Sequence, residues 1–219
     1  MMTYEEQKKN SAKPLLWISM VSMSLFFAGL SSGYIVAKSD VWPFYEVPIW
    51  FYISTIVIIA SSFTMHKAKK LIQNDQQSEA VSWINKIIAS SFTMHEAKKL
   101  IQNDQQLEAV RWIKYTLALG LSFVISQFLV WSSLVKQGFY FTPPNSSDFY
   151  HSSGFLYAFT AAHLLHLLAG IIVLLVCWYK ASNLKYSNGN SLGFELASIF
   201  WHFLDILWVY LFLFLLLIR

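Results

Sequence analysis

Five stretches of the chain contain few or no charged residues and are long enough to cross a membrane. A transmembrane helix needs roughly 20 consecutive apolar residues. The five stretches are Leu15–Ala37, Val47–Met65, Tyr115–Val135, Gly154–Tyr179 and Gly193–Ile218. Because backbone groups in lipid must form their hydrogen bonds within the segment, each stretch is predicted to be an α-helix. We therefore expect an all-α, polytopic membrane protein with a five-transmembrane-helix bundle, forming a single membrane domain over residues 1–219.

Composition supports this assignment and excludes other classes of protein. Charged residues make up 13% of the 219 residues, whereas a soluble domain usually carries about 25%. With 18 Phe, 11 Tyr and 9 Trp, the chain is not disordered, because such side chains need an apolar environment. The single cysteine, Cys177, excludes an internal disulfide framework and a thiolate metal cluster within this chain. Pro14 is expected to open the first helix, since proline fits the first helical position.

The distribution of Lys and Arg predicts how the bundle is oriented. Of the 16 basic residues, 13 precede the first stretch, lie between the second and third, or lie between the fourth and fifth. The other connections carry Lys38, Lys136 and the terminal Arg219. Cytoplasmic loops of membrane proteins are enriched in Lys and Arg. We therefore expect a multi-pass protein of the bacterial cytoplasmic (inner) membrane, with its N-terminus cytoplasmic and its C-terminus outside.

A tandem repeat of 29 residues lies between the second and third stretches. Residues 58–86 and 87–115 are identical at 24 of 29 positions. At 100° per residue, 29 residues return to within about 20° of the starting angle, so a continuous helix would keep both apolar faces aligned. The repeat predicts an extended helical cytoplasmic hairpin, either a docking element or a tolerated insertion. His66 and His95 are copies of each other, which argues against a unique catalytic role for either one.

Ionisable residues inside a membrane span are costly and are therefore candidates for functional sites. This chain has five: His163 and His166 in the fourth stretch, and Glu195, His202 and Asp205 in the fifth. The rise of 1.5 Å per residue places His166 and Asp205 at a similar depth of about 18 Å. The two side chains could pair there if the helix faces meet.

Three interpretations of these residues remain open from their spacing alone. His166 and His202 could ligate a haem b between two helices, as in electron-transfer bundles. The polar residues could form a proton relay or a transport path. They could also form a structural network that orients helices and binds lipid headgroups or a partner subunit. Small residues predict close helix packing at Gly29, Gly33 and Gly170.

Two motifs in the last two stretches resemble those of the heme–copper oxidase subunit III family. The first is Ala162-His-Leu-Leu-His-Leu-Leu-Ala-Gly170. The second is Gly193-Phe-Glu195 followed by Trp201-His-Phe-Leu-Asp-Ile-Leu-Trp208. Five spans match the short bacterial form of that subunit. In many family members a membrane-embedded glutamate precedes a stretch like Leu25–Gly29, but this chain has Met23 at the corresponding position.

The resemblance implies a non-catalytic subunit of a respiratory terminal oxidase of the cytochrome c oxidase type, or of a quinol oxidase. Haem and copper would then be bound by partner subunits I and II, with no cofactor, metal or catalytic residue in this chain. Phospholipid would be a further partner, and no nucleic acid is expected. The residues assigned to the structural network or to lipid and partner binding are His163, His166, Glu195, Trp201, His202, Asp205 and Trp208.

Overall fold

The chain folds into five long helices. The computed structural model describes the backbone of residues 4–37, 46–86, 92–141, 150–183 and 192–218, and side chains within 11–37, 46–72, 107–141, 154–183 and 192–218. The helices are α1 (Tyr4–Ala37), α2 (Ile49–Lys86), α3 (Phe92–Lys136), α4 (Tyr150–Ser182) and α5 (Leu192–Leu217). The described residues contain no strand. The expectation of an all-α protein is confirmed.

Each helix contains a segment that is long and apolar enough to cross a membrane. These segments are Ser11–Ala37, Ile49–Ile72, Leu107–Lys136, Gly154–Ser182 and Leu192–Leu217. They overlap the five predicted stretches. Apolar residues from both copies of the repeat continue the buried faces of α2 and α3 beyond those stretches. Ile72, Ala109 and Ile113 are buried there.

The start of α1 differs from its prediction. This helix begins at Tyr4 and contains Pro14 in its interior, so the expectation that Pro14 opens the helix is wrong. Proline lacks an N–H and leaves the carbonyl four residues earlier without its helical partner, although its fixed φ fits a helix. That carbonyl belongs to Asn10, in the N-terminal part of α1 and before the charge-free stretch that begins at Leu15.

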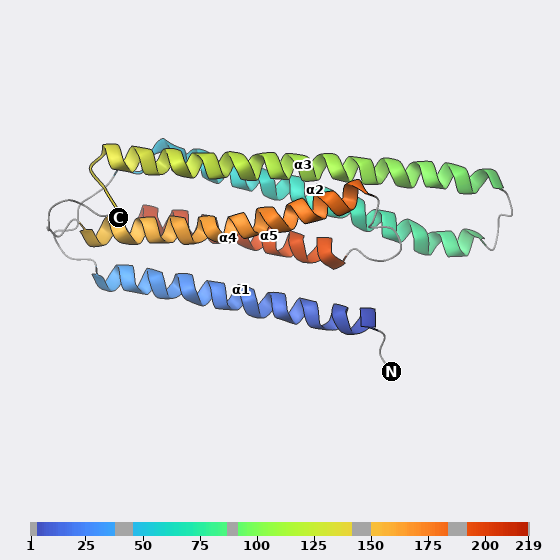
Figure 1. The fold of residues 1–219 in the computed structure, drawn as a ribbon, viewed down its shortest axis with the longest axis horizontal. Helices are drawn as coiled ribbons and strands as arrows, with labels where there is room; N and C mark the ends of the chain where they lie inside the picture. Colours follow the sequence, from blue (N-terminus) through green and yellow to red (C-terminus); the bar gives the residue numbers. More distant parts are fainter. Residues whose placement is uncertain (1–3, 38–45, 87–91, 142–149, 184–191, 219) are drawn as a thin grey trace.

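Four helices form a closed ring, and α1 lies outside it. In the described parts of the chain, α2 packs on α3, α3 on α4, α4 on α5, and α5 on α2. Helix α1 contacts α4 and α5 but neither α2 nor α3. Figure 1 shows this order as layers, with α1 on one side of α4 and α5 and the α2–α3 pair on the other. Helix α5 is therefore covered from three directions.

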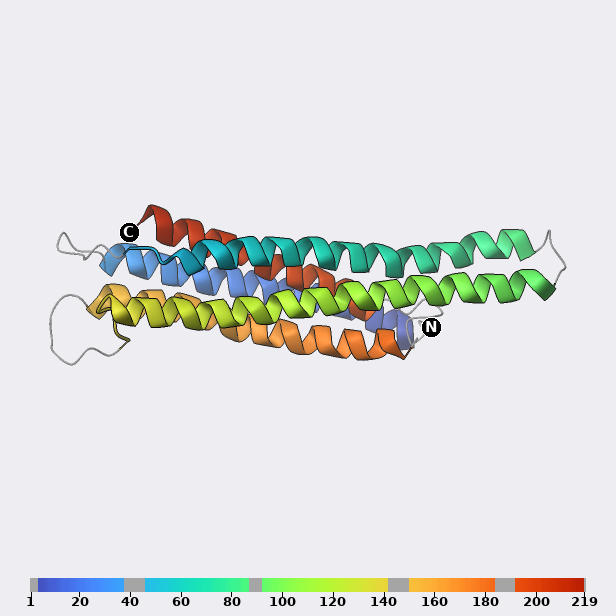
Figure 2. The same ribbon diagram turned by 90° about the horizontal axis from the view of Figure 1, so that it is seen from above.

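The α2–α3 pair extends well past the ends of the other helices (Figures 1 and 2). After Ile72, α2 continues to Lys86, which adds about 20 Å at 1.5 Å per residue. The predicted extended helical hairpin is confirmed in this respect. The hairpin projects at the same end of the bundle as the N-terminus, whereas the C-terminus lies at the opposite end (Figure 1).

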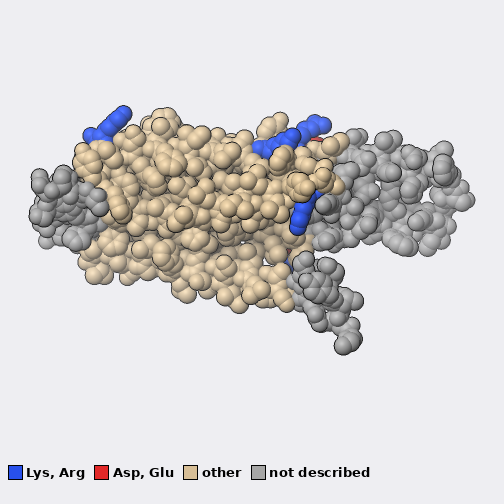
Figure 3. Space-filling view, in the orientation of Figure 1, with Lys and Arg blue, Asp and Glu red and all other residues tan. Residues whose placement is uncertain are grey.

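The described surface is mostly apolar, as a membrane-embedded bundle requires. In Figure 3, Lys and Arg side chains lie near the two ends of the described part, and the wide band between them carries no visible charge. Large apolar side chains are exposed on the outward faces of the helices, among them Leu25, Ile56, Ile125, Leu165 and Ile206. In lipid such side chains need no protein partner.

Candidate functional site

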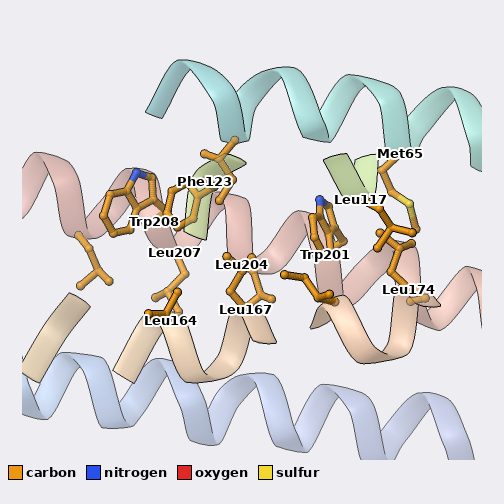
Figure 4. Packing of buried hydrophobic residues seen from close by; sticks show 14 of the residues in the cluster. Met65, Leu117, Phe123, Leu164, Leu167, Leu174, Trp201, Leu204, Leu207 and Trp208 are labelled. Atoms are coloured by element: carbon orange, nitrogen blue, oxygen red, sulfur yellow. The ribbon is translucent and has the colours of Figure 1, made fainter. Parts of the chain in front are cut away.

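Two tryptophans of α5 anchor that helix to α2. The indole N–H of Trp201 donates a hydrogen bond to Ser61 Oγ (2.9 Å), and that of Trp208 donates to Thr55 Oγ1 (3.1 Å). Both indole rings are fully buried, and Figure 4 shows them packed among apolar side chains two helical turns apart. A buried indole N–H needs an acceptor. The hydroxyls of α2 therefore fix which face of α5 points toward the inside of the ring.

Glycines on two other helices make room for this face of α5. A Cβ atom at Gly120 of α3 would lie 2.9 Å from Trp201 Cη2, and one at Gly170 of α4 would lie 3.0 Å from Leu204 Cδ1. Gly120 was missed by sequence reasoning, because a single glycine in an apolar helix gives no periodic signal. The predicted packing glycines differ among themselves: Gly33 approaches the Phe155 ring, but nothing lies within 4 Å of a Cβ at Gly29.

His163 lies in an aromatic cluster to which all four ring helices contribute. Its imidazole centroid is 5.1 Å from that of the Trp208 ring and 5.8 Å from that of Phe123. Phe51 stacks on Trp208 from α2, at 5.9 Å between centroids. The His163 side chain is fully buried, and neither ring nitrogen has a hydrogen-bond partner among the described residues. His163 therefore fills the centre of the bundle by ring packing.

His166 faces a different neighbour from His163. Its Nδ1–H donates to the backbone carbonyl of Ala162 (2.7 Å), which assigns the proton to that nitrogen. Its ring lies 6.0 Å from the Phe27 ring of α1, measured between centroids. Three residues along a helix correspond to a rotation of about 300°, so the two histidines diverge by about 60° around the α4 axis. His166 thus contributes to the contact between α1 and α4.

His202 and Asp205 lie at the α2–α5 interface. His202 Nδ1 is 2.6 Å from Ser62 Oγ of α2 and 3.9 Å from Asp205 Oδ2. The Ser62 side chain also interacts with the Asp205 carboxyl, although neither carboxyl oxygen has a hydrogen bond of ordinary geometry. The considered pairing of His166 with Asp205 is not formed. The two residues lie at similar depths, but α5 turns Asp205 toward α2 whereas α4 turns His166 toward α1.

Glu195 connects α5 to α1 near one end of the bundle. Its Oε1 is 2.9 Å from Lys13 Nζ, and both side chains are partly exposed. Toward the other end, the hydroxyl of Tyr210 on α5 hydrogen-bonds to Ser31 Oγ on α1 (2.9 Å). An ion pair of this exposure typically contributes up to about 1 kcal/mol. These two polar contacts therefore determine where α1 lies against the ring, but they contribute little to the free energy of its packing.

The geometry separates the candidate residues into three groups with different neighbours. The α2–α5 interface holds Trp201, His202 and Asp205; the central cluster holds His163 and Trp208; and the α1 contacts involve His166 and Glu195. His166 and His202 face different helices, so they do not present a common haem site. Among the residues whose side chains the structure describes, no group of three His, Cys, Asp or Glu could hold a metal ion.

Comparison with known proteins links this arrangement to one family. The family model for "Cytochrome c oxidase subunit III" matches residues 80–218. The chain is 29% identical over 201 residues to "Cytochrome c oxidase subunit 3" of Synechocystis sp., covering 89% of this chain and 70% of the relative.

Two further relatives have similar names. "Probable cytochrome c oxidase subunit 3" of Rickettsia prowazekii is 25% identical over 211 residues, covering 91% of this chain and 61% of the relative. The sheep protein (Ovis aries), named "Cytochrome c oxidase subunit 3", is 32% identical over 98 residues, covering 45% of this chain and 34% of the relative. The chain therefore spans between about a third and 70% of the length of these relatives.

Proposed function

The chain belongs to the cytochrome c oxidase subunit III family of the heme–copper oxidases, and from this premise we propose that it stabilises the catalytic subunit without carrying out redox chemistry itself. The complex would reduce oxygen and couple that reaction to proton translocation. Haem and copper would be held by partner subunits I and II, and this chain would bind phospholipid beside them. The match of residues 80–218 to the family carries the proposal.

The packing of the ring suggests how such a subunit would act. The buried tryptophans of α5 are hydrogen-bonded to α2, and the aromatic cluster around His163 joins all four ring helices. Interiors packed in this way resist deformation. We infer that the four ring helices form a rigid unit. The exposed apolar faces of its helices would contact lipid and the helices of partner subunits.

We also propose an orientation for the complex. The N-terminus, the hairpin, the end of α4 and the start of α5 lie at one end of the bundle (Figure 1), and 13 of the 16 Lys and Arg residues belong to the segments that meet there. The positive-inside rule favours the cytoplasm for that end. The chain would then lie in a bacterial cytoplasmic membrane with its C-terminus outside.

The assembled oxidase gives the test of the stabilising role. We expect His166→Ala or Asp205→Ala to reduce assembly or shorten the lifetime of the enzyme during turnover, while the initial haem spectrum stays intact. A loss of about 1–2 kcal/mol would change the ratio of assembled to unassembled protein roughly 5- to 30-fold. Ser122→Ala serves as the control, because the hydroxyl of this exposed residue bonds to Ala118 O of its own helix. Unchanged assembly and lifetime in both alanine variants would contradict the proposal.

A further inference from the structure

His66 and His95 occupy equivalent positions in the two copies of the repeat, and His66 lies in α2 beside α5. The His66 ring lies 6.4 Å from the His202 ring, measured between centroids. His95 is the fourth residue of α3, in the part of the hairpin that precedes the apolar segment beginning at Leu107. The structure therefore distinguishes two histidines that the sequence leaves equivalent.

The polar groups near His66 become steadily less exposed toward the interior. His66 is exposed and is followed by Lys67, Lys69 and Lys70, which mark the end of the charge-free part of α2. The His202 side chain is 29% exposed, and the Asp205 side chain is 6% exposed. Ser62 lies beside both, with its Oγ 2.6 Å from His202 Nδ1. The result is a graded series of proton-binding groups from the surface to a buried carboxyl.

The other charged or titratable groups around this part of α5 are few in the described structure. From α2, His66 and Lys69 are close enough to act electrostatically on His202. From α1, Lys13 is paired with Glu195. From α4, His163 packs against Trp208 and His166 is turned toward Phe27 of α1. Within the described structure no contact joins these last groups to Asp205, so His202 and Ser62 are its polar neighbours.

We propose that His66, His202 and Asp205 form a proton-exchange path that connects the buried Asp205 carboxyl to water at the hairpin end of the bundle. An acid in solution gives its proton to the His66 imidazole, where an N–H bond forms as the O–H bond of the acid breaks. His66 returns to its neutral form when its new N–H bond breaks and the proton binds Nε2 of His202, whose Nδ1 still carries its own hydrogen. The inference rests on the geometry of this chain and does not depend on the function proposed above.

The last step crosses the gap between His202 and Asp205. At 3.9 Å the two atoms are too far apart for a direct hydrogen bond. The Ser62 hydroxyl, 2.6 Å from His202 Nδ1, can bridge them when its side chain moves toward Asp205 Oδ2. Its oxygen then takes the proton from His202 Nδ1 and releases its own hydrogen to Asp205 Oδ2. His202 then becomes neutral and Asp205 becomes a carboxylic acid. The reverse sequence returns the proton to water.

Time-resolved infrared spectroscopy on the full chain in lipid nanodiscs tests the path. After a pH jump, the carboxylic C=O band of Asp205, assigned by its loss in Asp205→Asn, reports arrival of the proton. A positioned proton carrier typically contributes about 10²–10⁴ in rate, so we expect His66→Asn to slow the band by at least about tenfold. His95→Asn is the matched control and should leave the rate unchanged. Imidazole added to the His66→Asn protein should restore part of the lost rate.

Several results would overturn the path. One is an unchanged rate in His66→Asn, and another is equal slowing in His66→Asn and His95→Asn. A third is an Asp205 band that does not respond to pH in the unmodified protein. Because His66 is exposed, its substitution leaves the packed interior unchanged. Circular dichroism of each variant verifies that the helices remain folded.

Discussion

The two copies of the repeat carry nearly the same residues but meet different surroundings. In the first copy, Ile58, Ser61 and Met65 lie in α2 and are buried in the ring of helices. In the second copy, the equivalent stretch 87–94 lies between the end of α2 and the first residues of α3. At the C-terminal end of the repeat, residues of the second copy are the buried ones: Ala109 and Ile113 are buried in α3.

The difference shows that the position of a segment along the hairpin, rather than its sequence, decides its role. Ser61 accepts a hydrogen bond from Trp201 because the first copy continues a membrane span that faces α5. Thr64 of the first copy meets Thr116, one residue beyond the second copy, with 2.8 Å between their hydroxyl oxygens. Each copy therefore contributes one of its ends to the bundle. Substitutions at matched positions can separate the effect of location from the effect of residue type.

The largest contrast is expected for a charge placed at matched methionines. Met65→Asp puts a carboxylate at a fully buried position of α2, at a cost of about 3 kcal/mol or more. Met94→Asp makes the same change in the second copy, in the first turn of α3, and should be tolerated because the α2–α3 pair extends there beyond the other helices (Figure 1). The amount of folded protein in membranes and its thermal midpoint measure both effects. Equal loss in the two variants would contradict the role assigned to location.

A smaller contrast is expected at matched serines. Ser61→Ala removes the acceptor of the Trp201 N–H and leaves a buried donor unpaired, which costs about 1–3 kcal/mol. Ser90→Ala changes the equivalent residue of the second copy and should have little effect. Thermal unfolding followed by tryptophan fluorescence compares the two. A Ser61→Ala protein as stable as the Ser90→Ala protein would show that this hydrogen bond is not important.

The smallest effect is expected when one repeat length is removed. Deleting residues 73–101 joins Ile72 directly to Gln102, so that five residues, Gln-Asn-Asp-Gln-Gln, connect it to Leu107. Helix–helix connections of about 2–8 residues are common, and the apolar segments of α2 and α3 remain complete. Assembly and thermal stability should stay near those of the full chain. Failure of the shortened chain to assemble would mean that the extended hairpin has a required partner.

The number and type of the helices follow directly from the sequence, whereas their boundaries and rotations do not. Uncharged stretches identify the five spans because a bilayer imposes a minimum apolar length. Leu71, Ile72 and Val110 continue α2 and α3 beyond the charge-free runs, but charged residues separate them from those runs, so the sequence gives no single end point for either helix. The helical hairpin was predictable from the repeat between the second and third spans, but its division into α2 and α3 means that the angle kept by a continuous helix does not relate the two copies.

The candidate site shows a similar division. The rare ionisable residues could be selected by their cost in a membrane, and depth could be estimated from the helical rise. The side chains that contact these residues could not be predicted, because each residue advances the helix by about 100° and a small rotation of the helix changes the neighbouring side chain. His166 and Asp205 illustrate this point, since their depths agree but their directions differ. The hydroxyls of Thr55, Ser61 and Ser62 gave no sequence signal, because serine and threonine also occur on lipid-facing surfaces such as that of Ser122.

The position of α1 outside the ring has a consequence for the timing of biosynthesis. In the described structure α1 contacts only α4 and α5, so a helix that is synthesised before α2 and α3 packs on two helices that follow them. Between the end of α1 at Ala37 and the start of α5 at Leu192, a ribosome adding about 5–20 residues per second works for roughly 10–30 s. During that interval α1 stays among lipids with an open face, which a membrane chaperone or a neighbouring subunit can cover until α5 arrives.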